Sequence, residues 1–335
     1  MVTIFDVADK AGVSVVTVSR LLNNPKIVSP RTAAKIHKVI DQLNFQPSQV
    51  ARSLVSRRTN TIGVIMPDIK NPFFNSWFRF VEVFANMHNL NVVLCNTEED
   101  TDKELKYVKL LHSQRVDGVI IAPHSAESVR YLMTVNMQFI QFDRIFQDIE
   151  SDIVKTDHYQ GAFEAVEYLI RLGHKRIGLL RGPGILHADI QRSAAYVDAL
   201  RKHHLRYDTS LVVNGEFNED RGCTAARSLL TMKNPPTAIF SIGSLLTTGV
   251  IKAVQQLHLA IPKDISLIGF DEIPGQEIYQ PEITHVEQPV EELARTVLQA
   301  LIRRMDEPCV MTPTSVLLKP RLVVGESCRD LRREN

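Results

Sequence analysis

Short apolar runs rich in β-branched residues recur from residue 61 onward, and stretches with helical periodicity separate them. The earlier runs read TIGVIM, NVVLC, DGVIIA and QFIQFD, and the later runs read IVKT, KRIGLL, TAIFSI and ISLIGFD. This alternation predicts βαβ units, and therefore parallel sheets with helices on both faces. Roughly ten strands favour two doubly wound parallel sheets, one in each of two lobes.

The length and composition exclude several protein classes. A chain of 335 residues with 44% hydrophobic and 23% charged residues fits a globular protein of two or three domains. It has neither an apolar membrane span nor a basic, apolar signal segment at its start. The four cysteines are scattered without a CxxC pair, which favours reduced thiols in a cytoplasmic, nucleoid-associated protein. We expect no metal site and no cofactor.

Positive charge is concentrated at the N-terminus. Residues 1–58 carry nine Lys and Arg against three Asp, a net charge of +6 in a chain whose total is +1. A small basic head on a mildly acidic body indicates a polyanion-binding module joined to a domain with another task.

The basic head carries the start and stop signals of three short helices. Thr3 and Asp6 form a capping-box pattern before residues 4–11, and Gly12 can end that helix. Ser14 can cap a second helix over residues 15–22. Ser29-Pro30 opens a third, with Ile36, Val39, Ile40 and Leu43 on one face. Three short helices with a tight first turn predict an all-α helix-turn-helix unit.

The second helix has the composition of a DNA-reading helix. Val15 and Val16 lie at its N-terminal end, where valine can pack against a thymine methyl group. Arg20 can bind guanine or a phosphate, and Thr17 and Ser19 are natural phosphate partners. The alternative, that the valines are all core residues, stays open at this point.

The segment QPSQVARSLVSRRTN follows the head, and it has two interpretations. It can be a plain linker. It can also be a hinge helix that orders only on DNA, pairs with its twin through Val50 and Ala51, and inserts Leu54 between base steps in the minor groove.

These motifs resemble the lactose/galactose-repressor (LacI/GalR) family of bacterial transcriptional regulators. TIFDVADKAGVSVVTVSRLLNN, SPRT and QPSQVARSL match its pattern from residue 3 through the hinge. The resemblance implies a homodimer on pseudo-palindromic double-stranded operator DNA, with Val15, Val16 and Arg20 reading bases and Leu54 as the wedge. The other DNA contacts that it implies are Thr3, Thr17, Ser19, Asn23, Ser29, Thr32, Ser48 and Ala51.

Polar and aromatic side chains follow the predicted strands of the body, where doubly wound folds bind ligands. These residues are Asn71, Phe73, Phe74, Asp143, Arg144, Arg192, Asp271 and Gln288. Aromatic faces stack on the C–H faces of sugar rings, and Asp and Arg bind vicinal hydroxyls. The set predicts a small sugar-like effector in a cleft between the lobes.

The body is similar to periplasmic sugar-binding proteins, and its strand-end residues, with Phe217, look like the pentose site of ribose-binding proteins. One departure is Gly243-Ser244, where that pattern has Asn or Asp. A hydroxyl partner is therefore missing or replaced by the weaker Ser244. Ribose is the leading effector, and another pentose or a sugar phosphate stays open.

The expected organisation has four parts: a DNA-binding domain over 1–46, a hinge and linker over 47–60, an effector and dimerisation domain over 61–326, and a tail over 327–335. Within the effector domain, lobe one takes about 61–157 and 285–317, and lobe two about 158–284 and 318–326. The tail after Val324 is too short for about three heptads, so we expect dimers and not tetramers.

Three rival functions have weaker support. GPGILH begins like a dinucleotide motif but has His187 where the third glycine belongs, so we expect no enzyme. A transport binding protein would leave the head unexplained. A catabolite-control-type regulator with a phosphocarrier protein or sugar phosphate as corepressor remains an alternative, with Arg303 and Arg304 either contacting that partner or forming a solvated helix face.

Overall fold

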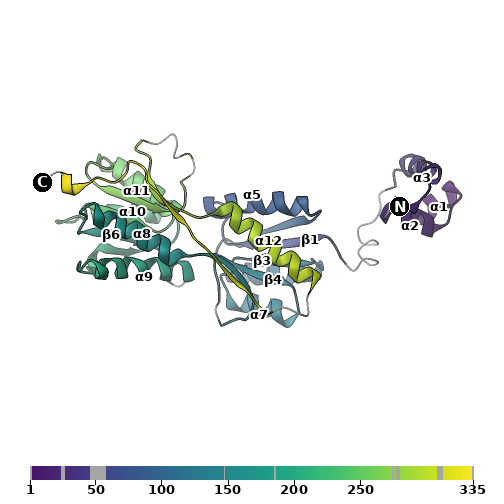
Figure 1. Ribbon diagram of the computed structural model, residues 1–335, viewed down its shortest axis with the longest axis horizontal. Coiled ribbons are helices and arrows are strands. Elements are labelled where there is room, and N and C mark those ends of the chain that lie inside the picture. The colour runs from purple at the N-terminus through teal and green to yellow at the C-terminus, as the bar shows by residue number, and fades with distance from the viewer. Residues whose placement is uncertain are drawn as a thin grey trace. The chain divides into compact units, whose positions relative to one another are not determined.

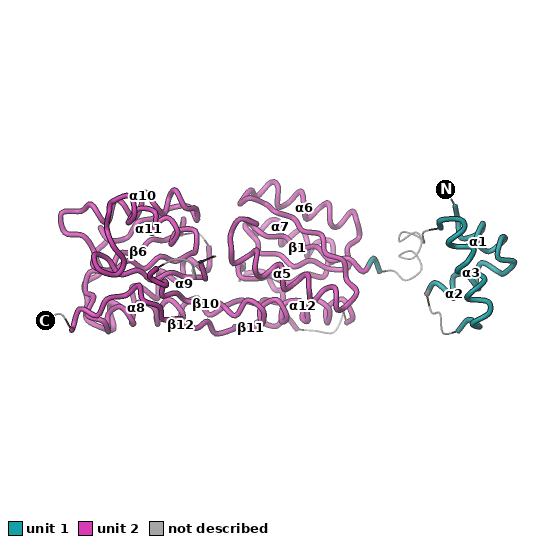
Figure 2. The backbone as a smooth tube through the Cα atoms, turned by 90° about the horizontal axis from the view of Figure 1, so that it is seen from above, with its two compact units in different colours: residues 1–59 teal, residues 60–335 magenta. Residues whose placement is uncertain are grey.

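The computed structural model describes residues 2–23, 27–45, 58–146, 148–184, 186–273, 275, 280–307 and 312–333. The chain forms two compact units, residues 1–59 and residues 60–335 (Figure 2). We describe each unit by itself. Among the described residues, no helix is long and apolar enough to cross a membrane.

The first unit consists of three helices, α1 (Ile4–Ala11), α2 (Val15–Asn23) and α3 (Pro30–Leu43). A capping box of Thr3 and Asp6 starts α1, and Gly12 ends it with φ 57°. Ser29 caps α3, which has Pro30 at its first position. The signals predicted at Thr3 with Asp6, at Gly12, at Ser14 and at Ser29-Pro30 are confirmed. Their apolar faces enclose one small core.

Lobe one of the second unit is built on a six-stranded sheet with the strand order β11-β5-β4-β3-β1-β2 (Figure 1). All of its strand pairs are parallel. Helices α5 and α12 cover one face, and α6 and α7 cover the other. The strands are β1 (Thr61–Met66), β2 (Asn91–Asn96), β3 (Gly118–Ile121), β4 (Phe139–Phe142), β5 (Asp152–Thr156) and β11 (Ser315–Leu318). The helices are α5 (Pro72–Met87), α6 (Thr101–Ser113), α7 (Ala126–Thr134) and α12 (Val290–Asp306).

Lobe two repeats this architecture with the order β12-β10-β9-β8-β6-β7. Helices α8 and α9 pack on one face, and α10 and α11 on the other. The strands are β6 (Ile177–Arg181), β7 (Val212–Asn214), β8 (Ala238–Ser241), β9 (Ser266–Phe270), β10 (Thr284–Glu287) and β12 (Arg321–Val323). The helices are α8 (His158–Arg171), α9 (His187–Lys202), α10 (Glu219–Leu230) and α11 (Ser244–Gln256), with short 3-10 helices η2 (Thr209–Leu211) and η4 (Leu331–Arg333).

The two predicted doubly wound sheets are confirmed, with one difference in strand direction. Strand β12 runs antiparallel to β10 at the edge of the second sheet. The chain leaves lobe two at the end of β10, runs through α12 and β11 of lobe one, and enters β12 directly from β11. Strand β12 therefore begins on the side of lobe two where β10 ends, and the two strands run in opposite directions.

The chain passes between the lobes three times, after β5, after β10 and after β11. The chain leaves lobe one after β5, which ends at Thr156. It returns only after Glu287, because Thr284–Glu287 pairs with β9 and completes the second sheet. The expected passage near residue 285 therefore falls inside a strand and moves to about three residues later. The third passage follows Leu318, one residue beyond the expected 317, because that residue still pairs with Thr156.

Candidate functional site

The hydroxyl side chains of the head lie at helix N-termini. Thr3 accepts a hydrogen bond from the backbone N–H of Asp6, and Thr17 lies 2.9 Å from the hydroxyl of Ser14. Ser29 and Thr32 form the same kind of contact at the start of α3, also at 2.9 Å. These ends carry unpaired N–H groups and a partial positive charge, which is an environment that favours phosphate oxygens. Ser19 lies in α2 and is half-buried.

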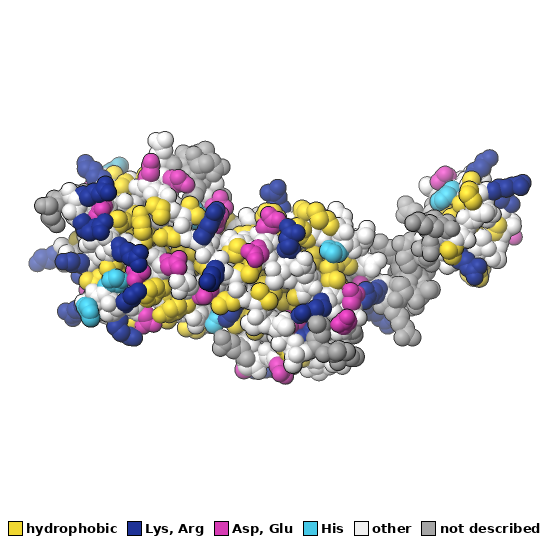
Figure 3. All heavy atoms as spheres, in the orientation of Figure 1, with side chains coloured by type: hydrophobic (Ala, Val, Ile, Leu, Met, Phe, Trp, Pro, Cys, Tyr) yellow, Lys and Arg dark blue, Asp and Glu magenta, His cyan; other side chains and the backbone are white. Residues whose placement is uncertain are grey.

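Helix α2 divides its side chains between the core and the surface. Val18 and Leu21 are buried among the three helices, and Val15 packs partly against the same core. Val16 is 57% exposed and Arg20 is exposed, so the hypothesis that every valine is a core residue is wrong. Lys and Arg side chains project around this unit in Figure 3. The exposed strip of α2 is therefore free to enter a groove.

Part of the predicted DNA interface lies outside the described residues. Ser48, Ala51 and Leu54 of the expected hinge fall in this category, and so does the side chain of Asn23.

Nine of the ten predicted effector residues line one cavity between the lobes. They are Asn71, Phe73, Phe74, Asp143, Arg144, Arg192, Phe217, Ser244 and Asp271. The tenth, Gln288, reaches the same place through a 2.5 Å hydrogen bond to Asp271. The cavity measures about 40 Å³. That volume admits water but is far below the roughly 300 Å³ of a small-ligand pocket.

Arg192 is the central cation of this cavity and is almost completely buried. Its Nη1 donates to the carbonyl of Ile242 at 2.6 Å, and its guanidinium lies 3.6 Å from the centre of the Phe270 ring. Its Nη2 lies 3.1 Å from His158 Nδ1. Asp271 is within ion-pair range of Arg192 at 3.9 Å. Several contacts thus fix the guanidinium in one orientation.

Two aspartates face this cation from equivalent positions in the lobes. Asp143 follows β4 with φ 59°, and Asp271 follows β9 with φ 71°. Left-handed backbone is uncommon for aspartate and marks a locally strained site. Burial raises the pKa of Asp271. Burial also opposes ionisation of Asp143, but His158 and the nearby arginines outweigh it and lower the pKa of that carboxyl.

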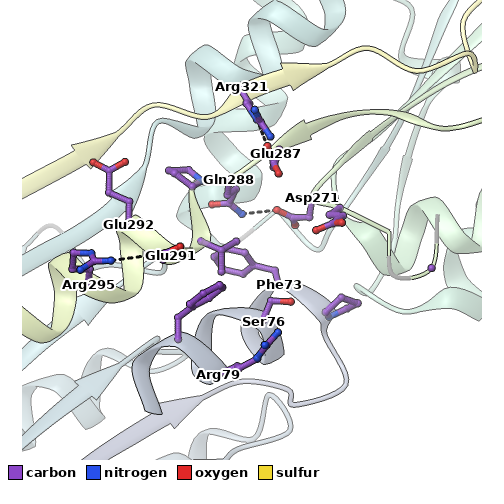
Figure 4. Close-up of a pocket in the computed structure, with 16 residues that line it drawn as sticks. Phe73, Ser76, Arg79, Asp271, Glu287, Gln288, Glu291, Glu292, Arg295 and Arg321 are labelled. Atoms are coloured by element: carbon purple, nitrogen blue, oxygen red, sulfur yellow. Dashed lines mark hydrogen bonds and ion pairs between the residues drawn. The ribbon is translucent and has the colours of Figure 1, made fainter. Parts of the chain in front are cut away.

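An open groove of about 980 Å³ lies beside the cavity and shares Phe73 and Asp271 with it. Figure 4 shows the amide of Gln288 directed at Asp271, between helix α5 and the strand that carries Glu287. Glu287 pairs with Arg321, and Glu291 pairs with Arg295 at 2.7 Å. These ion pairs flank the approach to the buried aspartate.

Arg144 does not offer a free charge to the cavity. Glu99 accepts two hydrogen bonds from its guanidinium, at 2.6 and 2.7 Å, and also contacts His124 at 3.0 Å. These partners lower the pKa of Glu99 to about 2. The ion pair keeps Arg144 at the wall of the cavity, where its guanidinium lies 5.7 Å from the Phe74 ring centre.

The Gly243-Ser244 departure has a steric reason in the structure. A side chain at residue 243 would lie 3.1 Å from the ring of Phe217, and one at Gly182 would lie 2.2 Å from it. Glycine at both positions therefore makes room for the aromatic wall. The Ser244 hydroxyl is buried and has no hydrogen-bond partner among the described residues, so it is available to a ligand.

Three residues of this site were not predicted from the sequence. Asp189 lines the cavity and accepts from the backbone N–H of Gly184 at 2.5 Å. His158 contacts the guanidinium of Arg192, and Glu99 pairs with the guanidinium of Arg144. His158 begins a helix directly after a strand, and that position was the only signal in the sequence that could have identified it.

The expectation of a solvated helix face at Arg303 and Arg304 is wrong for Arg304. Arg304 pairs with the buried carboxylate of Asp152, and its side chain is only 13% exposed, so it is not part of a solvated face. Asp152 also accepts from the backbone N–H of Thr314 at 2.6 Å. Arg303 donates to the Thr314 hydroxyl at 3.1 Å. The pair fastens α12 to the segment that precedes β11.

Comparison with known proteins finds two family matches. Residues 3–48 match the model for bacterial regulatory proteins of the lacI family, and residues 166–328 match a periplasmic binding protein-like domain. The HTH-type transcriptional regulator DegA of Bacillus subtilis is 33% identical over 98% of both chains. The ribose operon repressor of Halalkalibacterium halodurans is 33% identical over 98% of this chain and 99% of its own. Catabolite control protein A of Priestia megaterium is 34% identical over 92% and 94%.

Solved structures show the same architecture. The lac repressor dimer bound to operator and an anti-inducer superposes with a TM-score of 0.87 at 25% identity, over 98% of this chain and 99% of that one. A LacI family transcriptional regulator from Enterococcus faecium with bound ribose superposes with a TM-score of 0.75 at 29% identity, over 81% and 99%.

Proposed function

Because the chain belongs to the lacI family of bacterial regulatory proteins, it is a DNA-binding transcription regulator, and we propose that it represses a ribose or other pentose operon. In this proposal a pentose in the cleft between the lobes changes its affinity for the operator. The observation that carries the proposal is the convergence of nine sugar-type side chains on one cavity.

The chemistry of the cavity favours a neutral, polyhydroxylated ligand. Phe73, Phe74 and Phe217 offer apolar faces for the C–H side of a sugar ring. Three carboxylates and two guanidinium groups line the cavity, and Arg144 is already paired with Glu99. A phosphate would therefore meet surplus negative charge, whereas hydroxyl groups can donate to the carboxylates. The ribose repressor relative and the ribose-bound neighbour support this ligand class.

The DNA side of the proposal uses two copies of the head. We assign residues 1–46 to the DNA-binding domain, 47–60 to the hinge and linker, and 61–326 to the effector and dimerisation domain. A homodimer would read a pseudo-palindromic operator, with Val15, Val16 and Arg20 at base edges and the helix N-termini of Thr3, Thr17, Ser29 and Thr32 at phosphates. The operator-bound lac repressor dimer supports this arrangement.

The switch requires that the sugar favour one arrangement of the two lobes. A ligand shifts an equilibrium only by its difference in affinity between the states. The small volume of the cavity supports a movement of the lobes as the step to which sugar binding is coupled.

The test is a thermal-shift and calorimetry panel of pentoses, hexoses and their phosphates. We expect ribose or a close relative to raise the melting temperature, and Arg192→Ala to abolish this shift while DNA binding by the ligand-free protein persists. A shift that survives Arg192→Ala would contradict the placement of the effector in this cavity.

The DNA half has a separate test. Leu54→Ala is expected to weaken binding to a selected operator about tenfold or more, because the wedge that kinks the DNA is lost, and to leave sugar binding unchanged. Unchanged operator affinity would remove the wedge from the proposal.

The second candidate is a catabolite-control-type regulator with a phosphocarrier protein or sugar phosphate as corepressor. The similarity to catabolite control protein A favours it. A panel in which only sugar phosphates shift the melting temperature would replace the pentose proposal with this one.

A further inference from the structure

His158 lies behind the cavity, and the function proposed above gives it no role. It is the first residue of α8, one residue after the passage from lobe one to lobe two. Its side chain is buried, and its ring lies 6.0 Å from that of Phe270. A histidine sealed inside a protein needs a partner for each ring nitrogen.

The contacts of His158 determine its tautomer. Nδ1 lies 3.1 Å from Arg192 Nη2, and a guanidinium can only donate, so Nδ1 must accept. The remaining proton of a neutral ring is then on Nε2. Nε2 lies 3.3 Å from Asp143 Oδ1, although neither atom completes a well-aligned hydrogen bond. The Nε2–H of lobe two therefore faces the carboxylate of lobe one.

We infer that His158 is a positioning residue of the effector cleft, a neutral imidazole that holds Arg192 at Nδ1 and presents Nε2–H to Asp143 across the two lobes. It joins two proposed effector-binding groups that different lobes supply. Its identity as part of the effector site rests on the proposed function. Its tautomer and its coupling to Asp143 do not.

The surroundings of His158 favour the neutral ring. Asp143 after β4, Arg192 on α9 and Asp271 after β9 face it, and Lys155 and His187 lie nearby as a pair at 3.0 Å. Burial and Arg192 lower the pKa of His158, and together they outweigh the two aspartates. An imidazolium would lose its acceptor atom beside a guanidinium, so protonation would break the contact with Arg192.

The passage between the lobes explains why this residue can act at both. The side chain of Asp157 accepts from the backbone N–H of Gln160 at 2.9 Å and fixes the start of α8. His158 therefore begins lobe two directly at the passage from lobe one, so a change in the angle between the lobes would change the distance between its Nε2–H and Asp143. The misaligned 3.3 Å contact is the one that a change in lobe angle would tighten or release.

The first experiment needs no effector. Nitrogen-15 NMR of the full-length protein should show a His158 ring with a bare Nδ1 and a protonated Nε2 from pH 6 to pH 8, assigned by loss of the signal in His158→Asn. A proton on Nδ1, or a doubly protonated ring in this range, would overturn the inference. A double-mutant cycle of Asp143→Asn and His158→Leu in urea unfolding should also show coupling, and additive effects would overturn it.

The second experiment uses ribose and a matched pair of variants. Asn keeps one acceptor and one donor, whereas Leu has neither. Ribose affinity by calorimetry should fall about tenfold or more in His158→Leu, and His158→Asn should restore most of it. The control is His174→Leu, because His174 is a buried histidine of the same lobe whose ring nitrogens bond to the Thr237 hydroxyl and the Arg329 carbonyl and not to an effector-cavity residue. It should lose stability without losing ribose affinity.

The outcomes separate the two claims. Equal losses in the Leu and Asn variants, or wild-type affinity in His158→Leu, would overturn the positioning role. If the wild-type protein binds no ribose, the pentose proposal fails, and the NMR tautomer and the unfolding cycle still decide the inference.

Discussion

The two lobes share one strand order and differ in topology only in the direction of the edge strand, β11 or β12, yet the two lobes place equivalent aspartates in different surroundings. Asp143 and Asp271 each follow the third strand of their sheet, and both backbone N–H groups bond to the next strand, at Val154 and Val286. His158 and two arginines lower the pKa of Asp143, whereas burial raises the pKa of Asp271. Neighbouring groups of the protein thus compensate the negative charge of Asp143 in lobe one. The carboxylate of Asp271 in lobe two can still be stabilised by a ligand hydroxyl.

The lobes also differ in what a methyl group added at a closely packed glycine would meet, and this difference gives the largest expected effect. A Cβ atom at Gly249 of α11 would lie 2.3 Å from the backbone oxygen of Glu219 in α10. The atoms nearest to a Cβ atom at Gly63, in strand β1 of lobe one, belong to the flexible side chain of Leu111. We expect Gly249→Ala to lower the free energy of unfolding by about 3 kcal/mol and Gly63→Ala by about 1 kcal/mol. Urea unfolding at pH 7 measures both, and equal losses would contradict the difference in packing.

Acid should weaken lobe two before lobe one. His174 is sealed between the Thr237 hydroxyl and the Arg329 carbonyl, and burial lowers its pKa to about 4. The unfolded chain binds this proton near pH 6.5, so stability is present above that value and is lost as the pH falls toward 4. The loss at pH 4 is roughly 3 kcal/mol from this group.

Hydrogen exchange at pH 5 and pH 7.5 checks the acid effect lobe by lobe. Amides of the β9 strand and of the C-terminal segment after β12 should lose protection first. His174→Gln should flatten the pH dependence. Equal loss of protection in both lobes would show that the histidine is not the cause.

The features that could be predicted from the sequence are those with local signals. Thr3 with Asp6, Gly12 and Ser29-Pro30 each act within one turn of a helix, so the head could be predicted almost residue by residue. The strand-end rule placed the cavity residues together, because parallel strands present their carboxyl ends at one edge.

The features that could not be predicted depend on partners distant in the chain. Glu99 meets Arg144 across 45 residues, and His158 meets Arg192 across 34 residues. The periodic pattern of apolar residues is local, so it carries no information about pairs of residues this far apart in the chain. The direction of β12 and the passage after Glu287 depend in the same way on the partner strand and not on the local pattern.

The smallest expected effect is the most direct test of the two aspartates. Asp143→Asn removes the charge that faces His158 and Arg192, and it should lower the free energy of unfolding at pH 7 by about 1–2 kcal/mol. Asp271→Asn removes a buried charge that Gln288 and a more distant Arg192 face, at 2.5 and 3.9 Å. Its cost should be below about 0.5 kcal/mol, or the variant should gain stability, because an amide needs less solvation than a carboxylate.

Ribose affinity, measured on the same two variants, tests whether this difference in stability matters for function. If the Asp271 carboxylate is left for the ligand to bind, Asp271→Asn should lower ribose affinity about tenfold or more. Its unfolding midpoint should stay near that of the wild type. Asp143→Asn should lose both together, because its charge serves the lobes as well as the ligand. Calorimetry gives the ribose affinity of each variant, and urea unfolding gives its stability. If stability and affinity fall together in both variants, the two aspartates have the same role and the difference between the lobes is contradicted.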